Sequence, residues 1–155
     1  MRLTLLRHGP AVERDAWTGA DADRPLTEDG SRRTQAMLTS CASLVKADRL
    51  WVSPYLRARS TADLATKTWR LRAEDMPWLV PGAATAAQRL AHLAGAGDVV
   101  LVGHEPDLGE LIGAALGGPA IPLAKAGFAV LEGEPVAGGM ALRLLLTPKA
   151  VGRLR

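Results

Sequence analysis

The chain has 155 residues, of which 48% are hydrophobic and 23% are charged, and its formal net charge is +3. This composition is ordinary for one globular domain with its own core, and the charge is too small to indicate a nucleic-acid partner. No apolar run reaches the roughly 20 residues that a membrane-spanning helix needs. The single cysteine, Cys41, excludes an internal disulfide, and the sequence shows no secretory leader. We therefore expect a cytoplasmic protein of one domain, residues 1–155, without membrane association.

The first half of the chain alternates between strand and helix. The uninterrupted apolar run at 2–7 predicts a strand that is buried on both faces, and the polar stretch at 9–25 predicts a loop. Thr27 is the expected N-cap of a helix with acidic residues in its first turn, where the helix dipole favours them. A short strand at 50–52 then leads into Ser53-Pro54, the pattern of an N-cap and a first helical residue.

The second half continues the alternation. We expect a weak strand near 70–74, an alanine-rich helix at 84–94, a strong apolar strand at 98–103 and an amphipathic helix after Pro106. Two further strands are expected at 127–132 and 140–147, and the arginines at 149–155 are expected in a solvated tail. Strands that alternate with helices imply a three-layer α/β domain, with helices on both faces of a mostly parallel sheet.

Chemically active residues stand where three of these strands end. Arg7 and His8 follow the first strand, Arg57 lies one helical turn after the second, and His104 follows the strand at 98–103. Ligands of parallel sheets bind outside the carboxyl ends of the strands, and helices that begin there direct unpaired N–H groups to the same place. The sequence therefore predicts that these four residues converge on an anion site.

Two arginines and two histidines suit a phosphoryl group. Arg7 and Arg57 can each grip two phosphoryl oxygens with a planar fork. A neutral imidazole is a nucleophile toward phosphorus, and nearby arginines disfavour the imidazolium form of His8. His104, if protonated, would add another contact to the oxygens of the transition state. The two histidines are poor metal ligands, because no third histidine or carboxylate stands at ligand spacing, and we expect no function for His92.

Three motifs carry a family resemblance. Leu6-Arg7-His8-Gly9, Ser53-Pro54 with Arg57-Ala58 and Thr61-Ala62, and Gly103-His104 together resemble the histidine phosphatase superfamily, whose fold is phosphoglycerate-mutase-like. The resemblance extends from residue 1 to about residue 147.

Further features resemble the SixA-type phosphohistidine phosphatases within this superfamily. They are Arg24-Pro25-Leu26-Thr27, the run from Val102 to Pro106, and the lack of an inserted cap domain. The resemblance implies that His8 is the nucleophile and becomes phosphorylated, and that the phosphoryl oxygens are held by Arg7, Arg57 and His104. It also implies that water releases the phosphate and that no metal or organic cofactor is required.

The sequence assigns no general acid. Larger members of the family use a Glu or Asp after the second helix to protonate the leaving oxygen. The carboxylates available here are Glu74 and Asp75 near that point, and Glu13, Asp15, Asp21 and Asp23 in the first loop. An absent acid fits a leaving group that needs little help, such as the imidazole of phosphohistidine.

Three hypotheses therefore remain. The first is a metal-independent phosphatase acting on a phosphohistidine protein or a small phosphoramidate. The second is a phosphatase or mutase acting on a small phosphomonoester, which needs a well-placed acid. The third, a non-catalytic phosphate-binding module, is disfavoured because all four pocket residues are present. The sequence leaves open the phosphorylated partner and the oligomeric state.

Overall fold

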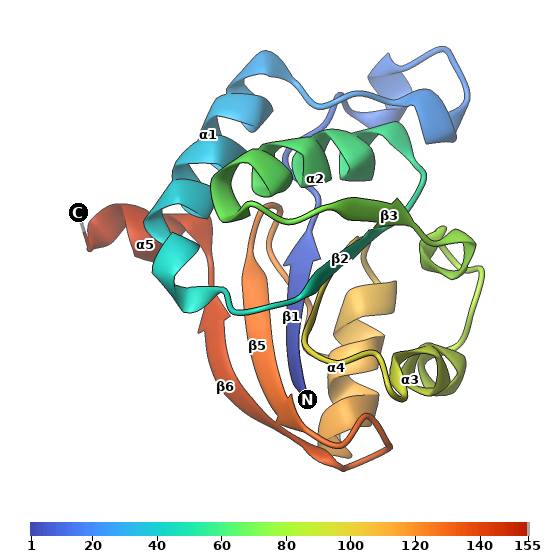
Figure 1. Cartoon of the computed structure of the whole chain (residues 1–155). Helices are drawn as coiled ribbons and strands as arrows, with labels where there is room; N and C mark the ends of the chain where they lie inside the picture. Colours follow the sequence, from blue (N-terminus) through green and yellow to red (C-terminus); the bar gives the residue numbers. More distant parts are fainter. Residues whose placement is uncertain (155) are drawn as a thin grey trace.

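A six-stranded sheet runs through the middle of the computed structural model, which describes residues 1–154 (Figure 1). Its strands are β1 (Arg2–Arg7), β2 (Arg49–Val52), β3 (Ala73–Asp75), β4 (Val99–Gly103), β5 (Phe128–Gly133) and β6 (Met140–Leu146). Their order in space is β3-β2-β4-β1-β5-β6. The pairs β3–β2, β2–β4 and β4–β1 are parallel, whereas β1–β5 and β5–β6 are antiparallel. The predicted mostly parallel sheet is confirmed.

Helices cover both faces of this sheet (Figure 1). They are α1 (Glu28–Ser40), α2 (Leu56–Trp69), α3 (Ala86–Leu93), α4 (Asp107–Leu116) and α5 (Pro148–Arg153). Buried side chains of α1, α2 and α5 pack on one face, and those of α3 and α4 pack on the other. No helix within residues 1–154 has both the length and the apolar character needed to cross a bilayer.

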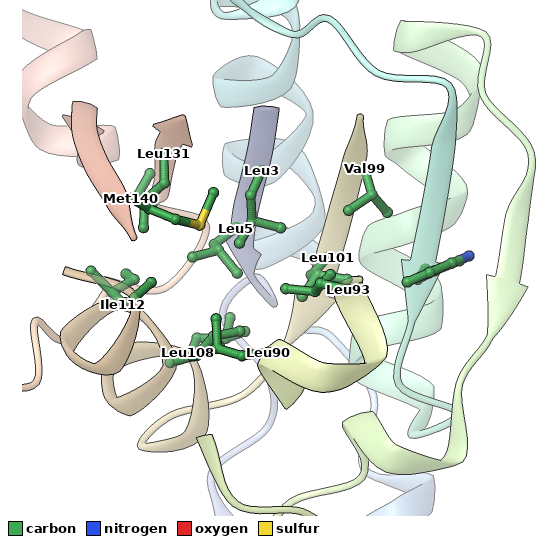
Figure 2. Packing of buried hydrophobic residues seen from close by; sticks show 14 of the residues in the cluster. Leu3, Leu5, Leu90, Leu93, Val99, Leu101, Leu108, Ile112, Leu131 and Met140 are labelled. Atoms are coloured by element: carbon green, nitrogen blue, oxygen red, sulfur yellow. The ribbon is translucent and has the colours of Figure 1, made fainter. Parts of the chain in front are cut away.

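The strands of the sheet centre are apolar throughout because both of their faces are buried. In β1, Leu3 and Leu5 belong to the core under α3 and α4, while Leu6 belongs to the core under α1 and α2. Figure 2 shows Leu5 and Leu101 of the sheet packed with Leu108 of α4. Burial of such side chains contributes about 1.5–3 kcal/mol each, which stabilises the central strands between the two helical layers.

The predicted cap of α1 is confirmed, because the Thr27 side chain accepts a hydrogen bond from Gly30 N at 2.9 Å. Two other local expectations were wrong. The first is the start of α2, which begins at Leu56 with Tyr55 as its N-cap, and not at Pro54. The Ser53 hydroxyl accepts from Tyr55 N and also contacts His104, so it does not cap the helix.

The second correction concerns the end of the chain, which is not a simple solvated tail. Residues Pro148–Arg153 form α5, whose N-cap Thr147 accepts from Ala150 N at 3.1 Å. Val151 is buried in the core cluster that also contains side chains of α1 and α2, so the segment packs against the domain. Arg155 lies outside the described residues.

Candidate active site

Three neighbouring strands deliver the predicted site residues side by side. In the parallel register Arg7 of β1 lies opposite Gly103 of β4, and Val52 of β2 lies opposite Val102. The ladder continues past the strand ends, because His8 N donates to Gly103 O at 3.1 Å and Ser53 N donates to Val102 O at 3.0 Å. His8, His104 and Ser53 are therefore the first residues beyond three adjacent strands.

His8 is buried with a defined tautomer. Its side chain is 6% exposed, and Nδ1 lies 2.8 Å from the carbonyl oxygen of Gly9. A carbonyl oxygen can only accept, so Nδ1 carries the hydrogen and Nε2 keeps its lone pair. The pKa of His8 is lowered to about 4, chiefly because burial desolvates the ring; the hydrogen bond to Gly9 opposes this shift, and the charges of Arg57, Arg7 and Arg24 add to it. Burial is thus a larger cause of neutrality than the arginines that the sequence identified.

The second histidine lies beside the first. The ring centroids of His8 and His104 are 5.2 Å apart, and the ring of Tyr55 covers His104 at 5.5 Å. Nε2 of His104 is 2.7 Å from Ser53 Oγ, whereas its buried Nδ1 has no hydrogen-bond partner among the described residues. Burial lowers the pKa of His104 to about 3, helped by His8 and Arg57. The free protein therefore holds a neutral His104 at pH 7, and not the protonated form considered from the sequence.

Both predicted arginines lie close enough to His8 for their charges to lower its pKa. Arg57 is 2% exposed, and its guanidinium lies 5.2 Å from the Tyr55 ring centroid. Arg7 donates from Nη1 to Leu123 O at 2.9 Å. In both arginines Nε is buried and has no partner among the described residues. Arg59, two residues further along the same helix, is instead exposed and pairs with Asp75 at 3.4 Å, whereas the charge of Arg57 lowers the pKa of both His8 and His104.

The turn after His8 requires glycine. A Cβ on Gly9 would lie 2.1 Å from Thr34 Oγ1, so no larger residue fits between β1 and α1. Gly9 N donates to Thr61 Oγ1 at 3.0 Å, and that hydroxyl donates to Arg57 O at 2.8 Å. The nucleophile turn is thereby linked to the helix that carries Arg57, which gives Thr61 of the sequence motif a structural role.

None of the six carboxylates considered from the sequence is placed as a proton donor. Burial raises the pKa of Asp21, but hydrogen bonds and charges from Arg24 and Arg57 outweigh it and lower the pKa. The distances are 3.0 Å to Arg24 Nε and 3.1 Å to Arg57 Nη2, so Asp21 is an ionised partner of the arginines. The remaining five, Glu13, Asp15, Asp23, Glu74 and Asp75, are exposed.

One carboxylate at the site escaped the sequence analysis. Glu105 directly follows His104 and is half-buried, with Oε1 accepting from Leu123 N at 3.2 Å. Desolvation raises its pKa, opposed by the Leu123 hydrogen bond and the charge of Arg7. The sequence could have indicated Glu105 only by its position next to His104, because its hydrogen-bond partner Leu123 lies 18 residues further along the chain.

Within residues 1–154 no group of three or more His, Cys, Asp or Glu side chains is arranged to hold a metal ion. His92 lies on α3, outside the pocket, where it stacks on Trp78 with ring centroids 4.8 Å apart.

Sequence comparison places this geometry in a family. Residues 3–80 match the profile of the histidine phosphatase superfamily (branch 1). The chain belongs to this superfamily. An uncharacterised protein of Picosynechococcus, strain PCC 7002, is 38% identical over 116 residues, which are 71% of this chain and 70% of that protein.

Solved structures show that the superfamily fold extends over nearly the whole chain. The protein histidine phosphatase SixA complexed with tungstate superposes with a TM-score of 0.86 at 24% identity, covering 97% of this chain and 99% of its own. The Entamoeba histolytica phosphoserine phosphatase in complex with 3-phosphoglyceric acid gives 0.71 at 15% identity, covering 94% and 96%. This histidine phosphatase therefore has the phosphoglycerate-mutase-like fold, and phosphatase is the activity that its family and fold support.

Proposed function

We propose that this chain hydrolyses phosphohistidine, or a small phosphoramidate, through a covalent phosphohistidine on His8. The observation that carries the proposal is the 2.8 Å hydrogen bond from His8 Nδ1 to Gly9 O. It leaves the lone pair on Nε2, and a pKa of about 4 keeps that lone pair unprotonated at pH 7. A buried, neutral imidazole held in one tautomer is a nucleophile ready for phosphorus.

Two displacements complete the reaction. In the first, Nε2 of His8 attacks phosphorus, and the bond to the leaving nitrogen breaks with its electron pair going to that nitrogen. Arg7, Arg57 and His104 hold the non-bridging oxygens, on which the negative charge lies. In the second, water attacks phosphorus and the bond to Nε2 breaks, which releases inorganic phosphate and restores neutral His8. The leaving nitrogen takes up one proton from solvent and the attacking water gives one up to solvent, so the enzyme returns unchanged.

The absence of a placed acid among the six sequence candidates favours a nitrogen leaving group. Asp21 is held ionised by Arg24 and Arg57, and Glu105 directs its Oε1 to a backbone N–H. General acid catalysis is worth about 10²–10⁴-fold where it operates. A substrate such as phosphohistidine, whose imidazole leaves readily, depends on it less than an alkyl phosphate does.

We also propose that the reaction needs no metal or organic cofactor. The two arginines and His104 supply the contacts that a divalent ion would otherwise make to phosphoryl oxygens. Nε2 of His104 is already engaged by Ser53 Oγ, which leaves it a poor metal ligand. We further propose that the substrate is a phosphorylated protein or a small phosphorylated compound, and that the protein acts in the cytoplasm.

The test combines trapping of the intermediate with a substrate series. The purified protein is incubated with phosphohistidine, aryl phosphates and sugar phosphates, and it is then quenched and mapped for the modified residue. We expect an acid-labile phosphoryl group on His8, fast turnover of phosphohistidine and slow turnover of sugar phosphates. His8→Ala should abolish turnover, while His92→Ala is the matched control and should not change it.

Each alternative hypothesis has its own result in this test. Equal rates for sugar phosphates and phosphohistidine would replace our proposal with a phosphomonoesterase. Phosphate binding without turnover of any substrate would identify a binding module.

A further inference from the structure

The loop that joins α4 to β5, residues 117–127, contacts Arg7 of β1, one of the two proposed phosphate-binding arginines. We propose that Glu105 is a positioning residue for Arg7 and acts through Leu123 of this loop. Arg7 Nη1 donates to Leu123 O at 2.9 Å, and Leu123 N donates to Glu105 Oε1 at 3.2 Å. The backbone of Leu123 therefore transmits the position of the Glu105 carboxylate to the Arg7 guanidinium. The inference rests on the proposed function, which gives Arg7 its contact with phosphoryl oxygens.

The loop is fixed to the nucleophile strand at its far end. Ala126 N donates to His8 O at 3.1 Å, and Arg7 N donates to Gly127 O at 3.1 Å. At its near end Ile121 N donates to the backbone oxygen of Gly109 at 3.0 Å. Between these two backbone anchors, Leu123 N is bonded to the Glu105 side chain. The buried side chain of Leu123 also packs in the core, so removing the Glu105 side chain releases the Leu123 backbone from its side-chain hydrogen bond while the ends of the loop stay in place.

A glycine on α4 makes room for this arrangement. A Cβ on Gly109 would lie 2.7 Å from Glu105 Oε2 and 3.1 Å from Ile121 O. Such contacts are shorter than van der Waals separation, so an alanine here would push away both the carboxylate and the loop. Gly109→Ala is consequently a second way to displace Leu123, through sterics and without altering any charge.

The orientation of Glu105 separates positioning from acid catalysis. Oε1 meets Leu123 N and Oε2 lies against Gly109, both on the side of α4 and the loop. The carboxylate also supports the charge of Arg7, whose pKa is lowered by burial and raised again by Glu105. Glu105 thus acts on Arg7 by geometry and by charge.

The experiment compares three variants with a matched control. Vanadate mimics the five-coordinate phosphorus of the transition state, so its Kd by calorimetry reports the anion site without turnover. A misplacement of about 1 Å can cost on the order of 10²-fold in rate. We expect Glu105→Leu and Gly109→Ala to weaken vanadate binding and lower kcat/KM by about 10- to 100-fold. Glu105→Gln keeps an oxygen for Leu123 N and should retain most of both, and Glu110→Leu, an exposed site on α4, should match the wild type.

A double-mutant cycle decides whether Arg7 mediates the effect. In an Arg7→Ala background, Glu105→Leu should cause no further loss of vanadate affinity, because the residue it positions is gone. If Glu105→Leu fails to fold, Gly109→Ala takes its place in the same cycle.

Three results would overturn the inference. They are wild-type vanadate binding by Glu105→Leu, a full additional loss in the Arg7→Ala background, or a steeper dependence of rate on leaving-group pKa in Glu105→Gln, which marks an acid. If Arg7→Ala itself binds vanadate normally, the proposed role of Arg7 falls as well. The behaviour of Arg7→Ala thus tells failure of the proposed function from failure of the inference alone.

Discussion

Acid should destabilise this protein through its two buried histidines. The pKa values of His8 and His104 are about 4 and about 3 in the folded chain, against 6.5 for an unburied histidine. When a folded-state pKa is lowered in this way, the unfolded chain binds more protons between the two values. Stability contributed by the neutral histidines is therefore complete above pH 6.5 and is lost progressively as the pH falls toward 4 for His8 and toward 3 for His104.

The size of the effect follows from these values. At pH 5 nearly all unfolded histidines are protonated, whereas the folded protein keeps both of these neutral. Each site then lowers the free energy of unfolding by about 2 kcal/mol relative to pH 8, at 1.36 kcal/mol for each pKa unit. The two sites together account for a loss of about 4 kcal/mol, a large fraction of the stability of a typical domain.

Urea unfolding at pH 8 and pH 5, followed by tryptophan fluorescence at constant ionic strength, measures this loss. In His8→Gln the loss should shrink by about 2 kcal/mol, because one buried titrating group is gone. The matched control is His92→Gln, which replaces an exposed histidine on α3 and should lose as much as the wild type. Equal losses in His8→Gln and the wild type would show that His8 is not held neutral by burial, and the argument for its nucleophilicity would fail with it.

Further predictions concern the arginines, a buried ion pair and metal ions. Arg57→Lys should lower kcat/KM by about 10²–10³-fold, because the ammonium group of lysine cannot make the two parallel hydrogen bonds of a guanidinium. Arg59→Lys should leave kcat/KM near the wild-type value. Asp107→Ala should lower the free energy of unfolding in urea by about 3–5 kcal/mol, because it strands the buried Arg89, 2.7 Å from Asp107. Pairing Arg89→Met with Asp107→Leu should recover much of that stability, and a single-variant loss below 1 kcal/mol would contradict the argument. Activity should survive prolonged dialysis against a chelator and be inhibited by vanadate, whereas rescue by added divalent ions would indicate a metal enzyme.

The sequence by itself determined the strands, the cap of α1 and which residues stand where the central strands end. Each of these features depends on residues that are close together in the sequence. An apolar run that is buried on both faces predicts a central strand, and Thr27 supplies its capping oxygen to a residue three positions away. Because parallel strands end at one edge of the sheet, His8 and His104 were predicted to meet, and their rings are 5.2 Å apart.

Tertiary structure alone decided how these residues are held and charged. The pKa of His8 depends chiefly on burial, which is produced by the whole fold and not by the neighbouring arginines alone. Asp21 looks like any loop carboxylate until the fold brings it to Arg57, 36 residues away. Glu105 likewise meets Leu123 only in the fold, because a hydrogen bond between distant segments depends on the packing of α4 against the loop, which no local pattern records.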